Sequence, residues 1–130
     1  MKSYDSLQIN FTPSNETYDL ITEIIGVKPT DKGFEKTRQE SPNTWTYQVI
    51  EEQDDPFYDF INIFLDLLEY KYDKLAEIGI KRSDISFWYL YEYDQQCNME
   101  FDPIRLKRLG ENGITLCISC WDSGQEYKIE

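Results

Sequence analysis

The stretch CNMEFDPIRLKRLGENGITLCISCW, residues 97–121, shows a clear succession of secondary-structure signals. Asp102 followed by Pro103 predicts the start of a helix, because aspartate caps the first amides and proline fits the first helical position. Gly113 predicts its end, since glycine readily takes the left-handed conformation that closes helices. Apolar residues alternate with polar ones on both sides of this helix. The stretch therefore predicts a strand–helix–strand unit.

A similar arrangement occurs near the beginning of the chain. Residues 9–13, INFTP, and residues 99–103, MEFDP, share the order apolar, polar, Phe, capping residue, Pro. A helix is predicted after each copy. It ends at a glycine followed by a β-branched residue, Gly26-Val27 in the first copy and Gly113-Ile114 in the second. The matching order predicts two pseudo-repeated strand–helix–strand units.

The middle of the chain contains the longest predicted helix. Apolar residues recur at helical spacing over residues 57–78, and Gly79 follows them. Strands are predicted at residues 45–50 and at residues 84–94, the latter apolar on both faces like a central strand covered on both sides. We therefore expect a single α+β domain over residues 1–130. It would have a mostly antiparallel five-stranded sheet with about three helices packed on it, and two pseudo-repeated units around a central long helix.

The charge of the chain narrows the class of partner. Its 130 residues include 25 acidic and 13 basic side chains, which give a net charge of −12. Such a surface repels nucleic acid, so the aromatic run FWYLYEY, residues 87–93, is interpreted as a buried strand. A basic protein is the favoured partner. No signal peptide and no apolar run of membrane-crossing length are recognised, so we expect a cytoplasmic protein without membrane association.

The motif CISC, residues 117–120, has the spacing of redox and zinc motifs. On the predicted strand Cys117 and Cys120 point to opposite faces, with Cα atoms about 10 Å apart, beyond the reach of a disulfide. The chain has no histidine and one further cysteine, Cys97. A four-ligand zinc site and histidine-dependent catalysis are therefore not expected. We predict no metal, no cofactor and no enzymatic activity, and we interpret the acidic residues 51–55 as a solvated connection.

Five acidic residues of the long predicted helix fall along one face and form the candidate partner-binding site. They are Asp59, Asp66, Glu69, Asp73 and Glu77. Two interpretations remain open: a docking stripe for a basic partner, or the solvated outer face of an amphipathic helix. A basic group is interpreted as ordinary surface or as the complement of this stripe in a homo-oligomer. Its members are Lys81, Arg82, Arg105, Lys107 and Arg108.

A frame of structural residues extends over most of the chain. It comprises Gly26-Val27-x-Pro29-Thr30, then Gly33 and Trp45, and finally residues 97–119, CNMEFDPIRLKRLGENGITLCIS. With this frame the chain resembles the bacterial domain-of-unknown-function family 4279, from which it departs at Val27 and at Asn112-Gly113. The resemblance implies neither an activity nor catalytic residues. Small acidic bacterial domains of this kind resemble immunity proteins, which implies an immunity- or antitoxin-like role by analogy.

Two functional hypotheses follow. The first is a non-enzymatic acidic interaction protein, immunity- or antitoxin-like, that binds a basic protein partner through the acidic stripe. The second is a small-molecule-binding or hydrolytic domain with a tyrosine- and carboxylate-lined pocket near residues 31–44. That polar stretch is interpreted as mobile, functional or a hidden hairpin. The absence of histidine and of catalytic motifs favours the first hypothesis.

Overall fold

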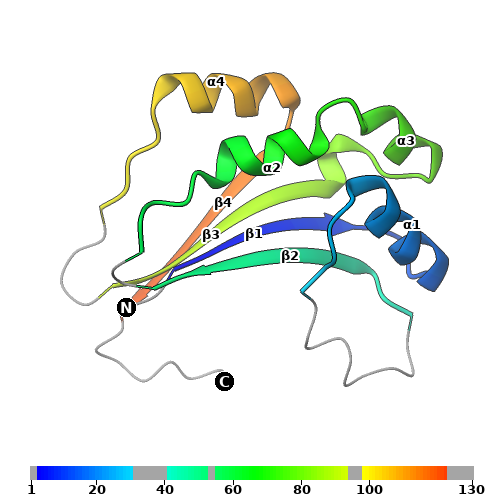
Figure 1. Cartoon of the computed structure of the whole chain (residues 1–130), viewed down its shortest axis with the longest axis horizontal. Coiled ribbons are helices and arrows are strands. Elements are labelled where there is room, and N and C mark those ends of the chain that lie inside the picture. The colour runs from blue at the N-terminus through cyan, green and yellow to red at the C-terminus, as the bar shows by residue number, and fades with distance from the viewer. Residues whose placement is uncertain (1–2, 31–40, 53–54, 94–97, 123–130) are drawn as a thin grey trace.

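One sheet forms the base of the fold in the structure, a computed structural model that describes residues 3–30, 41–52, 55–93 and 98–122. Its strands are β1 Ser3–Asn10, β2 Thr44–Glu51, β3 Ile85–Tyr93 and β4 Thr115–Asp122. They are ordered β2-β1-β3-β4 (Figure 1). β1 is antiparallel to both β2 and β3, whereas β4 is parallel to β3.

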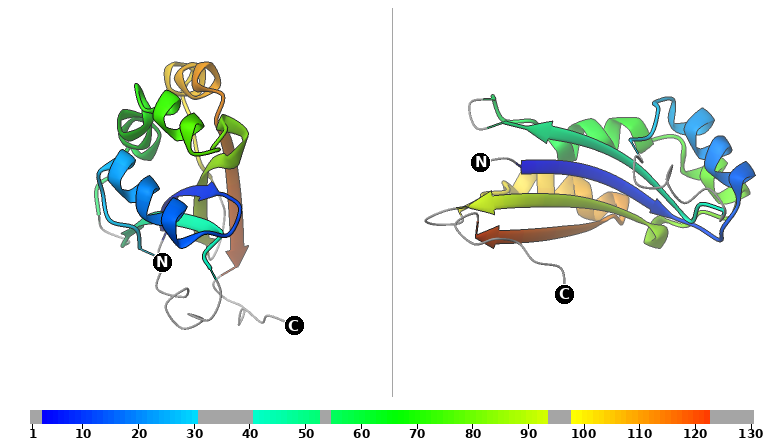
Figure 2. Two further views of the ribbon diagram at one scale, coloured as in Figure 1. Left: turned by 90° about the vertical axis from the view of Figure 1, so that its right-hand side faces the viewer. Right: turned by 90° about the horizontal axis from the view of Figure 1, so that it is seen from below.

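The helices lie on one face of this sheet (Figures 1 and 2). They are α1 Asn15–Ile25, α2 Phe60–Leu68, α3 Tyr72–Glu77 and α4 Pro103–Asn112, and a short 3-10 helix, Arg82–Asp84, precedes β3. The core fills the space between the two layers. Its fully buried large side chains include Leu7, Ile9, Ile21, Ile25, Trp45, Phe60, Phe64, Leu65, Leu68, Leu75 and Phe87. Burial of these apolar surfaces is the main stabilising contribution to the fold.

The α+β class is confirmed, but the five-stranded, mostly antiparallel sheet is wrong. The sheet has four strands and is mixed. Residues 98–101, expected as a strand, form none, because β1 and β4 take the positions on both sides of β3. Phe101 packs instead edge-on against the rings of Phe60 and Tyr89, with centroids 6.1 and 6.2 Å away.

The predicted pseudo-repeat is not realised in the tertiary structure. β1 and β2, which α1 connects, are antiparallel neighbours, whereas α4 connects the parallel pair β3 and β4. The second helix begins and ends as expected, capped by Asp102 and closed by Gly113 at φ 72°. The first begins later than Thr12-Pro13, because its cap is Ser14, whose Oγ accepts from the Thr17 N–H at 3.0 Å.

The long helix predicted over residues 57–78 is broken into α2 and α3. Between them Tyr70 takes a left-handed conformation at φ 71°, and its side chain is 99% exposed. A straight helix of the predicted length would measure about 33 Å, longer than the roughly 27–30 Å of strands of this size. The break redirects the chain, so that Leu75 is buried and α3 contacts α1.

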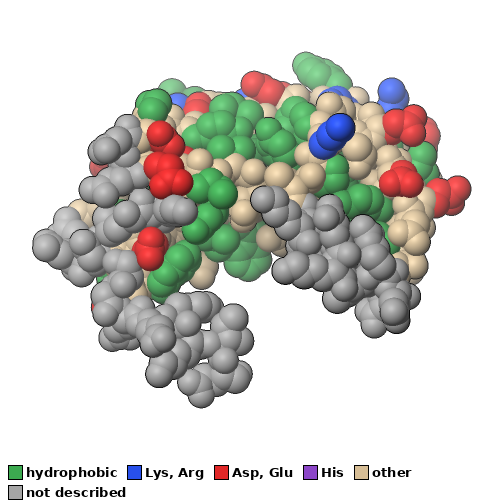
Figure 3. All heavy atoms as spheres, turned by 60° about the horizontal axis from the view of Figure 1, so that its bottom comes forward, with side chains coloured by type: hydrophobic (Ala, Val, Ile, Leu, Met, Phe, Trp, Pro, Cys, Tyr) green, Lys and Arg blue, Asp and Glu red, His purple; other side chains and the backbone are tan. Residues whose placement is uncertain are grey.

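The opposite face of the sheet has no helix among the described residues, so β3 is covered by helices on one side only. Tyr4, Leu90 and Trp121 lie on this face, and the rings of Tyr4 and Trp121 stack with centroids 6.5 Å apart. Figure 3 shows apolar side chains over the middle of the molecule from this side. Among the described helices, none combines the length and the apolar character that crossing a membrane requires.

Candidate functional site

The five acidic residues of the predicted stripe are divided between two helices. Asp59 caps the N-terminus of α2, Asp66 lies within α2, and Glu69 follows it directly. Asp73 and Glu77 lie on α3. The break at Tyr70 therefore separates the stripe into two groups with different surroundings, and the first group faces α4.

Arg105 of α4 joins the start of α2 to the start of α4. Its Nε and Nη2 atoms donate to the two carboxylate oxygens of Asp59 at 2.9 and 3.0 Å. Its Nη1 atom donates to Asp102, the N-cap of α4. This bidentate geometry is specific to arginine. The hydrogen bonds from Arg105 hold the pKa of Asp59 below its usual value, so this carboxylate is ionised at neutral pH.

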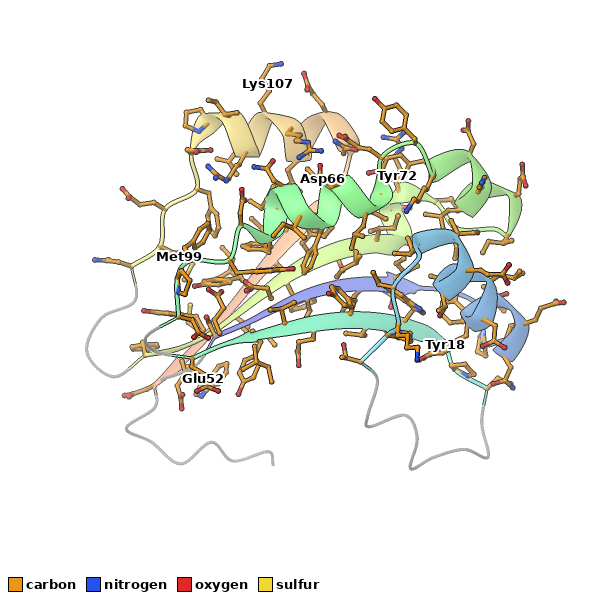
Figure 4. All side chains as sticks on the ribbon, in the orientation of Figure 1. Tyr18, Glu52, Asp66, Tyr72, Met99 and Lys107 are labelled. Atoms are coloured by element: carbon orange, nitrogen blue, oxygen red, sulfur yellow. The ribbon has the colours of Figure 1, made fainter. Side chains whose placement is uncertain are left out.

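Arg108, one helical turn further along α4, binds the carboxylates of Asp66 and Glu69. Its Nη2 atom donates to Asp66 at 2.7 Å and to Glu69 at 2.8 Å. Asn112 donates a further hydrogen bond to Glu69 at 3.1 Å and accepts one from the hydroxyl of Tyr72 at 2.7 Å. Asp66 and Tyr72 are labelled in Figure 4, on the helices below α4. Hydrogen bonds from Arg108 lower the pKa of Glu69.

These contacts supply, within one chain, the cations that the stripe would otherwise attract. Arg105 and Arg108 pair with Asp59, Asp66 and Glu69 within the chain, whereas the sequence led to their interpretation as ordinary surface or as a contact between copies of the chain. Such partly exposed pairs contribute little to stability, and they connect α4 to α2 and to Glu69 directly after it. The negative charge that remains available to a partner therefore lies elsewhere.

Exposed carboxylates without an internal cation lie on α1 and α3, two helices that contact each other. Figure 3 shows acidic side chains at the end of the molecule at which α1 and α3 lie. We define the α1–α3 acidic surface as Glu16, Asp19, Glu23, Asp73 and Glu77, all exposed. None of them forms a hydrogen bond or an ion pair with any residue in the described ranges. Lys74 is the exposed cation on α3, while Lys71 is occupied by the backbone carbonyl of Ile25 at 2.9 Å.

Two acidic side chains of neighbouring strands, Asp5 of β1 and Glu51 of β2, form a carboxyl pair. Asp5 of β1 is fully buried, with 0% of its surface exposed, and neither of its oxygens accepts a hydrogen bond from a donor of the protein. Burial, together with a hydrogen bond to Glu51 of β2, raises the pKa of Asp5 to about 9. Asp5 is therefore protonated at neutral pH, and its O–H donates to Glu51.

Tyrosines and backbone groups surround this carboxyl pair. Glu51 accepts from the backbone N–H of Tyr58 at 3.0 Å and from the hydroxyl of Ser3 at 3.4 Å. Burial raises the pKa of Tyr58 to about 12, with contributions from Tyr47, Asp5 and Glu51. A carboxyl pair that shares one proton can bind or transfer a proton.

Sequence reasoning missed this pair, although a signal was present. Asp5 stands in phase with Leu7 and Ile9, the inward-facing residues of β1, so a strict period of two predicts that it points into the core. Glu51 stands in phase with Trp45 of β2 in the same way. The interpretation of residues 51–55 as a solvated connection is wrong for Glu51, which is partly buried and accepts a hydrogen bond from Ser3. Residues 53 and 54 lie outside the described residues.

The cysteines occupy the places expected for strand residues. Cys117 pairs with Trp88 and Cys120 with Tyr91, so their side chains point to opposite faces of the sheet, and neither forms a disulfide within the described residues. Cys97 lies outside the described residues. Within those residues, no group of three or more cysteine or acidic side chains has an arrangement that could hold a metal ion.

A family model matches residues 6–123, most of the chain. Its description is domain of unknown function, DUF4279. This chain belongs to the DUF4279 family. The match confirms the resemblance seen in the sequence. Comparisons with curated proteins and with solved structures give no match, so inferences about function rest on the geometry of the domain.

The residues that relate the chain to DUF4279 have structural roles. Gly26 closes α1 in the left-handed conformation at φ 91°. Thr30 then binds the outer edge of β2, donating its N–H to the carbonyl of Thr46 at 2.7 Å and accepting from the N–H of Gln48 at 2.6 Å. Trp45 is buried and donates to Thr22 of α1 at 2.9 Å. Gly33, also part of the resemblance, lies outside the described residues.

Proposed function

We propose that this DUF4279 protein is a non-enzymatic interaction protein, immunity- or antitoxin-like, that binds a basic protein partner. The observation that carries this proposal is the α1–α3 acidic surface, whose carboxylates are exposed and have no cation partner within the described ranges. The net charge of −12 adds a long-range attraction toward basic proteins. Such attraction accelerates association and disfavours acidic competitors.

The proposed site includes only part of the acidic stripe that was predicted from the sequence. Asp73 and Glu77 belong to it, together with Glu16, Asp19 and Glu23 of α1. Asp59, Asp66 and Glu69 bind the arginines of α4, so a partner would have to displace these arginines before it could use them. Charges that are already paired contribute less to binding than free ones.

The test compares wild-type protein with the double variant Asp73→Lys/Glu77→Lys in a pull-down from a lysate of the native organism. The proposal expects the wild type to retain one basic protein at low salt. The double variant should lose it, because two cations would face the cationic surface of the partner. Calorimetry with the purified partner then measures the loss of affinity. We expect the affinity to fall about tenfold or more, because the variant creates two like-charge contacts.

The matched control is Glu100→Lys/Glu111→Lys, which changes the net charge by the same amount at positions outside the α1–α3 acidic surface. It should retain the partner with nearly wild-type affinity. If both double variants lost the partner equally, net charge alone would explain the binding. If both retained the partner equally, the α1–α3 acidic surface would not be the binding site.

A small-molecule-binding or hydrolytic domain is the second candidate. It is favoured by the carboxyl pair of buried Asp5 and partly buried Glu51 beside Tyr58. The raised pKa values of Asp5 and Tyr58 are typical of groups in binding and catalytic sites. This candidate expects a ligand that raises the melting temperature without any protein partner. A metabolite screen by thermal shift tests it, and a screen in which no compound stabilised the protein would count against this candidate.

A further inference from the structure

A groove separates the segments that lead into α2 and α4. Its volume is about 550 Å³, within the range of roughly 300–1,000 Å³ that small-molecule sites occupy. Phe57 and Asp59 come from the first segment, and Glu100, Phe101 and Asp102 come from the second. It lies at the end of the helix layer opposite α1, on the side of Met99 in Figure 4.

The apolar wall of the groove is rigid on one side and exposed on the other. Phe101 is held by edge-on contacts with Phe60 and Tyr89, and Ile61 at the base is 1% exposed. Phe57, by contrast, exposes 62% of its surface at the rim. A ligand that enters the groove would cover this ring, and the removal of apolar surface from water would favour binding.

The charges around the groove favour a cation. Asp59, Glu100 and Asp102 line it together with a single basic residue, Arg105. The guanidinium of Arg105 is already shared between Asp59 and Asp102. Glu100 is exposed and has no hydrogen-bond or ion-pair partner among the residues that the structure describes. An excess of negative charge therefore remains beside an aromatic wall.

We propose that this groove binds a small organic cation, an ammonium or guanidinium group on an apolar body. The cation lies beside the carboxylate of Glu100, which has no partner among the described residues. The negative charge of Asp102 adds to the attraction. The apolar body packs against Phe57 and Phe101. Aromatic faces add a cation–π attraction for such ligands. The site is separate from the α1–α3 acidic surface, so it depends neither on a protein partner nor on the first proposed function.

The experiment titrates the full-length protein with benzylamine, benzyl alcohol and benzoate at fixed pH and ionic strength and follows backbone amide shifts by NMR. These probes share one ring and differ in charge. We expect benzylamine to bind saturably and to shift the amides around residues 57–61 and 98–105. Benzyl alcohol should bind at least about threefold more weakly, the effect of one exposed charge pair, and benzoate should bind more weakly still.

Two variants and one control locate the binding. Glu100→Gln should weaken benzylamine binding about threefold while leaving benzyl alcohol unchanged, because only the charge pair is lost. Phe57→Ala should weaken both ligands. Glu111→Gln on the outer side of α4 removes one exposed carboxylate as well, and it should change neither.

Three results would overturn the inference. Benzoate binding more tightly than benzylamine would make Arg105 the recognition element and the groove a site for anions. No saturable binding of benzylamine, or an equal effect of Glu100→Gln and Glu111→Gln, would remove the cation site. If a lysine peptide with blocked termini bound the groove more than tenfold tighter than benzylamine, the groove would be a site for a protein side chain and not for a small organic cation. Asp73→Lys/Glu77→Lys should leave all these affinities unchanged, which separates this test from that of partner binding.

Discussion

The least expected residue is Asp5, a carboxyl group at the centre of an otherwise apolar sheet face. Leu7 and Ile9 follow it on the same face, and Tyr89 lies directly opposite on β3. An ionised carboxylate in this place would lack donors, because no donor of the protein bonds to its oxygens. Protonation and a hydrogen bond to Glu51 avoid that cost, so the folded state holds a proton that an exposed aspartate would release.

This proton links stability to pH. The pKa of Asp5 is raised from 3.8 to about 9 by burial and by Glu51. Below about pH 4 both the folded and the unfolded states are protonated, and stability is highest with respect to this group. Between that pH and about 9 the unfolded state releases the proton and the folded state keeps it. Stability therefore falls as the pH rises through this window.

We expect Asp5→Asn to stabilise the protein at pH 7, by on the order of 2 kcal/mol, because asparagine needs no proton to remain neutral. The dependence of the free energy of unfolding on pH between 5 and 8 should become flatter. Urea denaturation at several pH values measures both effects. The exposed Asp19→Asn serves as the control and should change neither, whereas an unchanged pH slope in Asp5→Asn would refute the assignment of the proton.

At the scale of elements, the break between α2 and α3 is the feature that the periodic pattern did not reveal. Leu68 and Leu75, on either side of it, are seven positions apart and both fully buried, so the pattern remains compatible with one continuous helix. No glycine or proline marks the break. Instead Tyr70 adopts a left-handed conformation that costs a residue with a side chain about 1 kcal/mol.

Glycine at position 70 should relieve this strain. We expect Tyr70→Gly to be more stable than Tyr70→Ala by about 1 kcal/mol, because both lose the same exposed ring and only glycine takes positive φ without a steric cost. Since the Tyr70 side chain is 99% exposed, its removal costs little burial. Chemical denaturation of the two variants measures the difference. If the alanine variant were equally stable, the left-handed conformation would not be present in solution.

Local patterns elsewhere predicted elements well. The caps of α4 at Asp102 and Gly113 agree with the structure, and so does the strand predicted at residues 45–50, which lies within β2. The failures occurred where a segment could form more than one structure. Residues 98–101 alternate like a strand, but Phe101 gains aromatic contacts with Phe60 and Tyr89 in the groove wall instead. Tertiary packing overrides local propensity in such segments.

At the scale of the whole molecule, charge opposes the compact state. The net charge of −12 is only partly compensated within the chain, since Arg105 and Arg108 pair with α2 while the α1–α3 acidic surface has no cation partner among the described residues. Like charges that are brought together by folding repel one another, and salt screens this repulsion.

We therefore expect the melting temperature to rise by about 3 °C or more between 20 and 500 mM NaCl, the effect of roughly 1 kcal/mol in a domain of this size. Asp73→Asn/Glu77→Gln, which removes charge from the α1–α3 acidic surface, should show a smaller rise. Differential scanning calorimetry measures both. A melting temperature that fell with salt would mean that the α2–α4 ion pairs outweigh the repulsion.

By itself the sequence determined the family, the α+β class, the acidic character and the caps of α4 at Asp102 and Gly113. These properties depend on composition and on neighbours within a few residues, which the sequence states directly. Only the tertiary structure decided the parallel pairing of β4, the break at Tyr70, the burial of Asp5 and the capture of Asp59 and Glu69 by arginines 46 and 39 positions away. These features arise when distant segments pack together. Their energies depend on which surfaces meet, and a local pattern carries no information about that.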